Sequence, residues 1–180
     1  MTNDLPALLA RHEPTDDKER RDLATMQAFA ASLAEPFSRT QWPAHFTASA
    51  VVVDPGFERV VLVHHAKLLR WLQPGGHVEP GDASIVEAAL REAKEETGLD
   101  VDFRAREPLD VDVHVIPARK TEPEHQHLDV RFLLVAANPQ ALAHDPTESH
   151  GAQWLPWDEA LTRADEAPLR RLLGKARARR

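Results

Sequence analysis

The chain has 180 residues, of which 42% are hydrophobic and 28% charged, a composition that suits one globular domain with an extension. Its formal net charge of −7 argues against nucleic acid or an anionic membrane as a partner, and an anionic ligand would need a positive mediator. The absence of cysteine excludes disulfides, thiolate zinc sites and a cysteine nucleophile. The sequence starts without a signal-like pattern and has no apolar run near 18 residues, so we expect a cytoplasmic protein.

Residues 1–42 are expected to form a helical extension packed on the main domain. Acidic residues open the stretch, and apolar residues such as Leu23 and Met26 then recur at helical spacing. Pro36 is expected to end the helical part. These helices could also mediate a homodimer, a question that the sequence leaves open.

Residues 43–165 are expected to form the main domain, because strand-like and helix-like segments follow one another there without repeats. In chain order we expect strands at 46–54 and 59–65, a Gly-rich loop at 67–76, a helix at 83–97, strands at 109–117 and 127–136, and a short strand and helix at 152–161. This order predicts an α/β (α+β) fold with a mixed sheet covered by helices. Residues 166–180 are expected to form a C-terminal helix and basic tail.

The helix predicted at 83–97 carries its own start and stop signals. Ser84 and Glu87 have the spacing of a capping box, although Asp82 competes for the N-cap position. Gly98 stands where a left-handed residue would end the helix. The boundaries of this helix are therefore predicted from local chemistry rather than from periodicity alone.

Three carboxylates, Glu92, Glu95 and Glu96, crowd the second half of this helix, where their mutual repulsion should weaken it. At about 100° per residue, Glu92 and Glu96 lie one turn apart at the edge of the apolar stripe, and Glu95 flanks them. A buried unpaired carboxylate is costly, and a hard divalent cation such as Mg²⁺ or Mn²⁺ would remove that cost. The alternative is a solvated helix whose carboxylates pair with Arg91 and Lys94.

The Gly-rich loop and this helix together resemble the Nudix box, the signature of the Nudix hydrolases, written G-x5-E-x7-R-E-U-x-E-E-x-G-U with U a bulky aliphatic residue. Gly76 fills the first position and residues 91–99 match the second half. Two features depart from the pattern. Asp82 stands in the first acidic position, eight residues rather than seven before Arg91, and Ala93 replaces a larger aliphatic residue.

The resemblance implies an α/β/α sandwich and a Mg²⁺-dependent pyrophosphohydrolase, with Mn²⁺ as a substitute metal. The expected substrate is a small nucleoside diphosphate derivative, cleaved by water at a phosphoanhydride bond. Glu92 and Glu96 would be the principal metal ligands, with Glu95 and the Gly76 carbonyl as further ligands. Arg91 would orient a carboxylate. The general base would be Glu92 or Glu148, in the loop before the last strand.

Polar side chains alternate with apolar ones along residues 125–134, which places four polar groups on one face of a strand. That face could be a wall of the substrate cleft, could bind a second metal, or could simply be solvated. Two residues near the Gly-rich loop could also reach a phosphate. The expected substrate-binding residues are Arg70, His77, His125, His127, Asp129 and Arg131.

Two further functions compete with hydrolysis on the same fold. A non-hydrolytic nucleotide sensor is one, although such proteins often lose box carboxylates and this chain keeps all three. A prenyl diphosphate isomerase is the other, and the lack of cysteine argues against it. The sequence does not choose among dinucleoside polyphosphates, nucleotide sugars, oxidised nucleotides and dinucleotide coenzymes.

Overall fold

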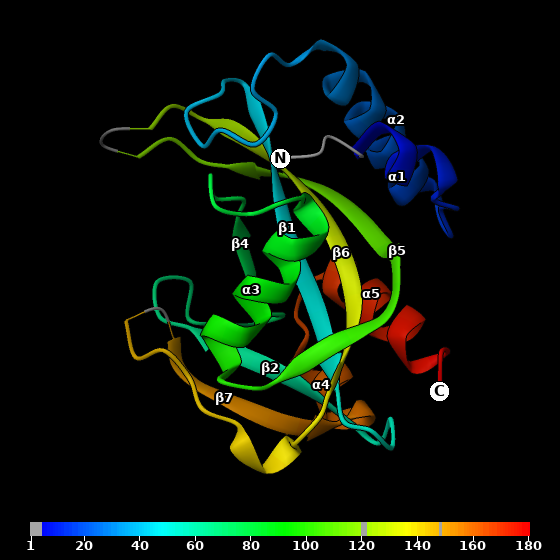
Figure 1. The fold of residues 1–180 in the computed structure, drawn as a ribbon, viewed down its shortest axis with the longest axis vertical. Coiled ribbons are helices and arrows are strands. Elements are labelled where there is room, and N and C mark those ends of the chain that lie inside the picture. The colour runs from blue at the N-terminus through cyan, green and yellow to red at the C-terminus, as the bar shows by residue number, and fades with distance from the viewer. Residues whose placement is uncertain (1–4, 120–121, 148) are drawn as a thin grey trace.

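A computed structural model describes residues 5–119, 122–147 and 149–180. A mixed sheet of seven strands lies between helices, which confirms the predicted fold class (Figure 1). No helix in the described part of the chain is both long and apolar enough to cross a membrane. The elements are α1 (Leu5–Arg11), α2 (Asp17–Ser32), β1 (Ala44–Val53), β2 (Arg59–His65), β3 (Arg70–Leu72), β4 (Gly75–His77), α3 (Ile85–Thr97), β5 (Val101–Ile116), β6 (His125–Ala136), η1 (Pro139–Ala141), β7 (Ser149–Pro156), α4 (Trp157–Arg163) and α5 (Ala167–Arg177).

Strand β1 is the centre of the sheet, and all ten of its residues are buried. It pairs in parallel with β6 and antiparallel with both β2 and β4. The main strand order is β3-β2-β1-β6-β5, with β7 on β2. The β-branched and small apolar residues of β1 suit a strand buried on both faces, and its buried polar residues, His45, Thr47 and Ser49, lie on one of those faces.

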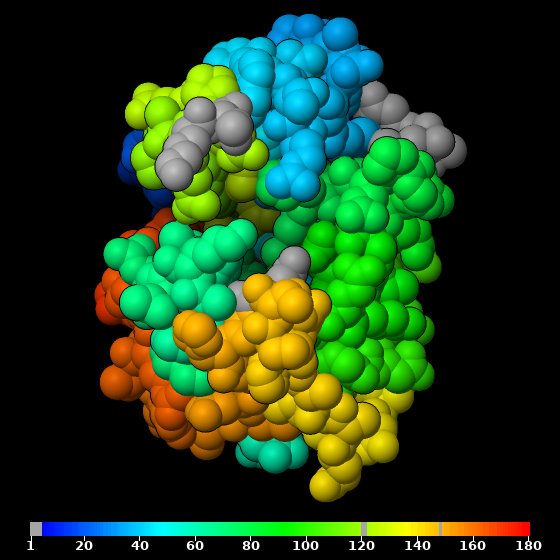
Figure 2. Space-filling view, turned by 90° about the vertical axis from the view of Figure 1, so that its left-hand side faces the viewer, coloured from blue at the N-terminus to red at the C-terminus, as the bar shows by residue number. Residues whose placement is uncertain are grey.

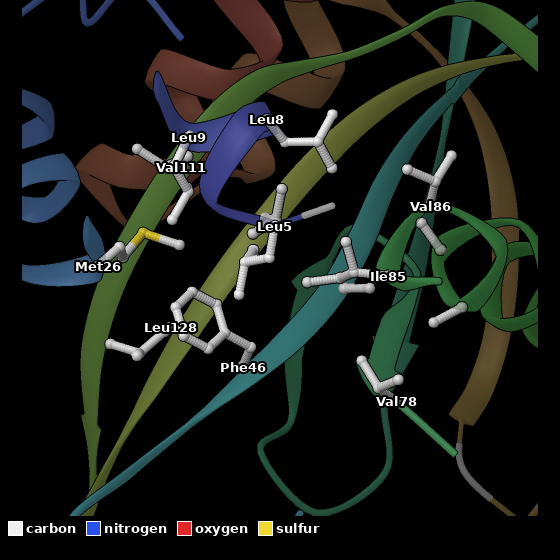
Figure 3. Packing of buried hydrophobic residues seen from close by; sticks show 14 of the residues in the cluster. Leu5, Leu8, Leu9, Met26, Phe46, Val78, Ile85, Val86, Val111 and Leu128 are labelled. Atoms are coloured by element: carbon white, nitrogen blue, oxygen red, sulfur yellow. The ribbon is translucent and has the colours of Figure 1, made fainter. Parts of the chain in front are cut away.

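The two faces of β1 and β6 meet different partners because side chains alternate along a strand. On one face, Phe46 and Leu128 pack with Ile85 of α3 and with Leu5 and Met26 of the N-terminal helices (Figure 3). On the other face, the lower half of the sheet packs against α4 and α5, which lie behind it in Figure 1. The box helix α3 is therefore fixed to the sheet by its apolar side.

Helix α3 begins and ends as its sequence predicts. The Ser84 hydroxyl accepts a hydrogen bond from the backbone N–H of Glu87, and Gly98 ends the helix with φ of 64°. Asp82 is not the N-cap; its side chain points to Arg91 instead. The helix starts at Ile85, two residues later than expected, because Ser84 takes the capping conformation.

Three parts of the chain differ from the predicted elements. Strand β5 starts at Val101 rather than at 109, and its first half has exposed residues and two register shifts, which hide the alternation that a strand prediction needs. The Gly-rich loop contains the short strands β3 and β4. The C-terminal helix was expected, but α5 continues into the basic tail as far as Arg177, and Ala176 is fully buried.

Candidate active site and metal centre

The angular positions of the α3 carboxylates predict that Glu92 and Glu96 are less exposed than Glu95, which the structure shows, but Glu92 rather than Glu96 is the more buried of the two. Glu92 is buried, Glu96 is partly buried one turn further on, and Glu95 is exposed. All three project from a helix whose apolar side is fixed to the sheet, so their backbone positions are rigid. These three carboxylates therefore place oxygen atoms at the edge of the core with three different degrees of solvent exposure.

Arg91 holds the box together through its guanidinium. Its Nη1 donates to Glu92 Oε1 at 3.0 Å and to Glu95 Oε2 at 2.8 Å, and its Nη2 donates to the carbonyl of His77 at 2.9 Å. The nearby carboxylates, Asp82 above all, raise the pKa of Arg91, so the side chain stays charged. Its contacts are those of a positioning residue, which links the helix to strand β4.

Asp82 completes this arrangement and explains the extra residue before Arg91. Its carboxylate accepts from Arg91 Nε at 2.9 Å and Nη2 at 3.0 Å, a bidentate pair, and from the backbone N–H of Glu79 at 2.8 Å. Burial alone would raise the pKa of Asp82, but these hydrogen bonds lower it. Asp82 therefore reaches Arg91 although eight residues rather than seven separate the two. This contact gives the first acidic position of the box a role that the sequence did not reveal.

Gly76 brings the loop close to the Glu92 carboxylate. A Cβ at this position would lie 2.7 Å from Glu92 Oε1 and 2.9 Å from Oε2. The backbone of β4 therefore approaches the carboxylate directly. Carboxylate and carbonyl oxygens are the hard donors that Mg²⁺ prefers, so Glu92 and the adjacent backbone of Gly76 are of the chemical type that suits this ion.

We predict that Gly76→Ala will lower Mg²⁺-dependent turnover by about 10-fold or more, because the new methyl group displaces the Glu92 carboxylate. The matched control is Gly81→Ala, where an added Cβ meets no atom within 4 Å. Steady-state kinetics over a range of Mg²⁺ concentrations checks both variants. Equal activity of the two alanine variants would contradict the proposed contact between Gly76 and Glu92.

The surface beside the box is hollowed. Figure 2 shows a depression between the green box segment, the light-blue segment before β1, the yellow-green β5–β6 turn and the teal β2–β3 turn. Four separate parts of the chain therefore surround one opening next to α3. A ligand in this depression would contact loops held in place by the sheet, an arrangement common for binding sites.

Arg131 does not present a free guanidinium to this surface. It is 4% exposed, and it donates to Asp129 Oδ2 at 2.8 Å, Asp112 Oδ2 at 3.1 Å and Asp110 Oδ2 at 3.3 Å. Asp129 is also buried and accepts from the hydroxyl of Ser49 at 2.8 Å. We expected Arg131 and Asp129 to bind substrate. Their burial and mutual pairing indicate a structural role instead, because a buried charge needs such partners.

Arg70 pairs with carboxylates away from the box. Arg70, at the start of β3, forms ion pairs with Asp165 and Glu166 at the junction of α4 and α5. Its guanidinium is thus occupied by two carboxylates, although it is about half exposed. Glu148 lies outside the described residues. The next residue, Ser149, starts β7 opposite His65 of β2.

Histidines gather on the sheet beside the box. His77, His125 and His127 were expected from the sequence to contact substrate, and the structure brings them together with His45 and His114. The rings of His77 and His127 are 5.0 Å apart, and that of His114 is 5.5 Å from His127. His45 and His114 were missed because only the pairing of β1, β5 and β6 places them opposite His127.

Three of these histidines, His45, His77 and His127, favour the neutral form. Burial is the main cause, and it lowers the pKa of His77 to about 4 and that of His127 to about 2, with neighbouring cationic or imidazole groups adding to the effect. Burial also lowers the pKa of His45, and the nearby backbone of Gln41 partly opposes this shift. Neither ring nitrogen of His45 has a hydrogen-bond partner of good geometry in the described residues. At neutral pH these rings offer uncharged nitrogen atoms.

Comparison with known protein families shows which family this sequence matches. A family model described as NUDIX domain matches residues 43–174, most of the chain. The chain belongs to the Nudix family. The predicted family is confirmed, and the match extends through β7 and α4 into α5.

Two individual relatives match shorter stretches of the chain than the family model does. The chain is 35% identical over 105 residues to a putative 8-oxo-dGTP diphosphatase of Bacillus subtilis (strain 168), covering 58% of this chain and 62% of that protein. It is 33% identical over 119 residues to the m7GpppN-mRNA hydrolase NUDT17 of Xenopus laevis, covering 59% of this chain but 40% of the relative. The chain thus spans less than two thirds of either protein.

The fold has solved counterparts. The crystal structure of a C. elegans Ap4A hydrolase binary complex superimposes with a TM-score of 0.59 at 22% identity, covering 74% of this chain and 95% of that one. A NUDIX-family hydrolase from Clostridium perfringens gives a TM-score of 0.57 at 24% identity, covering 76% and 98%. At this identity the comparison establishes the shared fold.

Proposed function

We propose that this chain is a Mg²⁺-dependent pyrophosphohydrolase that cleaves a phosphoanhydride bond in a nucleoside diphosphate derivative. The observation that carries the proposal is the approach of Gly76 to the Glu92 carboxylate, with Glu96 one turn away on the same rigid helix. Family membership supports it, because Gly76 and residues 91–99 stand at the matching positions of a Nudix box in a chain of the Nudix family.

The charges around the box support a metal requirement. The chain carries a net charge of −7, and Arg91, Arg131 and Arg70 are each paired with carboxylates. A diphosphate would therefore meet carboxylates at the box unless a cation lay between them. When bound, Mg²⁺ would neutralise both sets of oxygens and lower the pKa of a bound water.

The residues of the chain would divide the remaining work. Glu92, Glu95, Glu96 and the Gly76 carbonyl would hold the metal, and Arg91 would keep Glu92 and Glu95 in position. A carboxylate would accept a proton from the attacking water. Glu92 and Glu148 are the two candidates for that role, and Glu92 already lies against the loop that would hold the metal.

We infer a nucleoside polyphosphate as the substrate class. Two relatives at 33% and 35% identity are named for a capped mRNA end and for 8-oxo-dGTP, and both names describe a nucleoside joined to several phosphates. His77 and His127, both partly exposed, are the proposed contacts for the substrate, since neutral imidazole can donate a hydrogen bond to phosphate oxygen. The choice of base is not specified by these contacts.

A phosphate-release screen tests the proposal. We expect Mg²⁺-dependent hydrolysis of at least one member of a panel of dinucleoside polyphosphates, oxidised nucleotides, nucleotide sugars, dinucleotide coenzymes and cap analogues. Repeating the best reaction in ¹⁸O water identifies the phosphorus that water attacks. Tight binding of one compound without hydrolysis of any would instead favour the nucleotide-sensor alternative.

A further inference from the structure

We propose that His45, His77 and His127 form a binding site for one transition-metal ion, distinct from the carboxylate site of the box. One ring nitrogen of each residue lies within 4.8 Å of one nitrogen of each of the others. The three ring centroids form a nearly equal-sided triangle, with separations of 4.9, 5.0 and 5.2 Å. Zn²⁺–nitrogen bonds are about 2.0–2.1 Å long, so small movements of the side chains would bring these nitrogen atoms closer together on binding.

His45 supplies the independent reason to place a ligand here. Its side chain is buried, with the residue only 1% exposed, and neither ring nitrogen has a hydrogen-bond partner in the described residues. Leaving a buried polar group unpaired costs about 1–3 kcal/mol, so native proteins rarely do so without a reason. A metal ion bound to one of these nitrogens would satisfy it.

The sheet fixes the three histidines relative to one another. His45 of β1 lies directly opposite His127 of β6 in the parallel pair, and His77 of β4 lies opposite Thr47 of β1. Because residues two apart on a strand share a face, His45 and Thr47 point to the same side, as does His77. The site is therefore built on three neighbouring strands rather than on loops, as a well-defined coordination geometry requires.

The rings of His125 and Trp42 pack beside the proposed site. The ring of His125 stacks on His45 at 5.0 Å, and its Nδ1 bonds with the Pro123 carbonyl at 2.8 Å. Trp42 packs edge-on against His125 at 4.7 Å. Such contacts limit the rotation of the rings, in the same way that outer contacts orient the ligands of known metal sites.

The donor atoms determine the class of metal. Three neutral imidazoles suit Zn²⁺, Cu²⁺, Ni²⁺ or Co²⁺, whereas Mg²⁺ and Ca²⁺ prefer oxygen. Three protein ligands leave one position open, as in catalytic rather than purely structural zinc sites. His77 and His127 are partly exposed, so water or a substrate oxygen can reach that open position.

The proposed site is joined to the box through consecutive residues. Gly76 faces Glu92, while the next side chain, that of His77, points to the opposite side of β4. The carbonyl of His77 also accepts a hydrogen bond from Arg91. An ion held by His77 would therefore stiffen the strand that positions the box loop, without sharing any ligand with the box.

A Co²⁺ titration tests the site independently of hydrolysis. The background is the double variant Glu92→Gln/Glu96→Gln in excess Mg²⁺, so that the box carboxylates cannot be the source of binding. We expect one Co²⁺ per chain by equilibrium dialysis, with visible d–d bands typical of low-coordinate nitrogen ligation. His77→Asn and His127→Asn should each weaken binding by about 100-fold.

The matched control is His144→Asn, an exposed histidine outside the cluster, which should bind Co²⁺ as the background does. His77 and His127 are only partly buried, so their variants should fold, and thermal melting curves check this. The proposal is overturned if the background protein binds no Co²⁺, or if the folded His77 and His127 variants bind it unchanged. Loss of phosphohydrolase activity alone would bear on the proposed function and not on this site.

Discussion

Glu92→Gln and Glu96→Gln are each expected to lower Mg²⁺-dependent kcat by about 100-fold or more, because each removes a charged oxygen donor while keeping the shape of the side chain. Glu92 should show the larger loss, since it is the more buried of the two and lies against Gly76. A weakened metal site should also raise the Mg²⁺ concentration needed for half-maximal rate. Initial rates on the best substrate, measured across a Mg²⁺ titration, give both quantities.

Glu87→Gln is the matched control for these variants. Glu87 lies in the first turn of the same helix and forms a partly exposed ion pair with Arg106 at 2.9 Å. Such pairs contribute about 0–1 kcal/mol to stability, so the substitution should leave both folding and turnover nearly unchanged. If Glu92→Gln and Glu96→Gln behaved like Glu87→Gln, their assignment as metal ligands would be wrong.

The box helix was predictable because its signals are local. Ser84 and Gly98 mark its ends, and a period of about 3.6 residues places Glu92 and Glu96 at the edge of the apolar side. Strand β2 was predicted with the same bounds that the structure shows, since Arg59–His65 has a β-branched, apolar centre and follows a clear turn. Where neighbours in sequence determine the structure, the sequence alone is sufficient.

The polar face of β6 was predictable only in part, because its contacts depend on strand register. Alternation correctly groups Asp129 and Arg131 on one face, but their partners come from other strands. Asp110 lies opposite Arg131, and Asp112 lies opposite Asp129, in the antiparallel pairing of β5 with β6. Without that register, a buried ion-pair network looks the same as a solvated substrate wall.

The same limit explains why the histidine cluster was incomplete in the sequence. His125 and His127 stand out as a pair, whereas His45 lies about eighty residues earlier, directly before the strand predicted at 46–54. It joins the cluster because β1 and β6 pair in parallel with His45 opposite His127. Long-range pairing of this kind is not encoded in any local pattern.

Glu19→Gln is expected to lower the free energy of unfolding by about 1–3 kcal/mol at pH 7, because it removes the charge of a fully buried carboxylate. The loss is limited because Lys175 keeps a second partner, Asp110, at 2.9 Å. The Glu19 carboxylate is 0% exposed, pairs with Lys175 of α5, and lies 2.7 Å from His12 Nε2. It also accepts from the backbone N–H of Thr15 at 2.7 Å. The N-terminal helices are thus connected to the C-terminal helix through one carboxylate. Chemical denaturation measures the change.

Asp17→Asn is the control for Glu19→Gln, because Asp17 lies in the same helix with its side chain 84% exposed in a pair with Arg20. Its loss should change stability by at most about 0.5 kcal/mol. A similar loss in the two variants would mean that the buried pair contributes nothing beyond a surface pair.

The pH dependence gives a second test of the Glu19 contact. Burial alone would raise the pKa of Glu19, but hydrogen bonds from His12, Lys175 and Thr15 hold it far below its ordinary value of 4.5. Below pH 4.5 the unfolded chain therefore binds a proton at Glu19 that the folded chain does not, so this contribution is complete above pH 4.5 and is lost as pH falls. The difference in free energy of unfolding between the wild type and Glu19→Gln should therefore become smaller as pH falls below 4.5. A difference that stays constant would show that the negative charge of Glu19 does not contribute to stability.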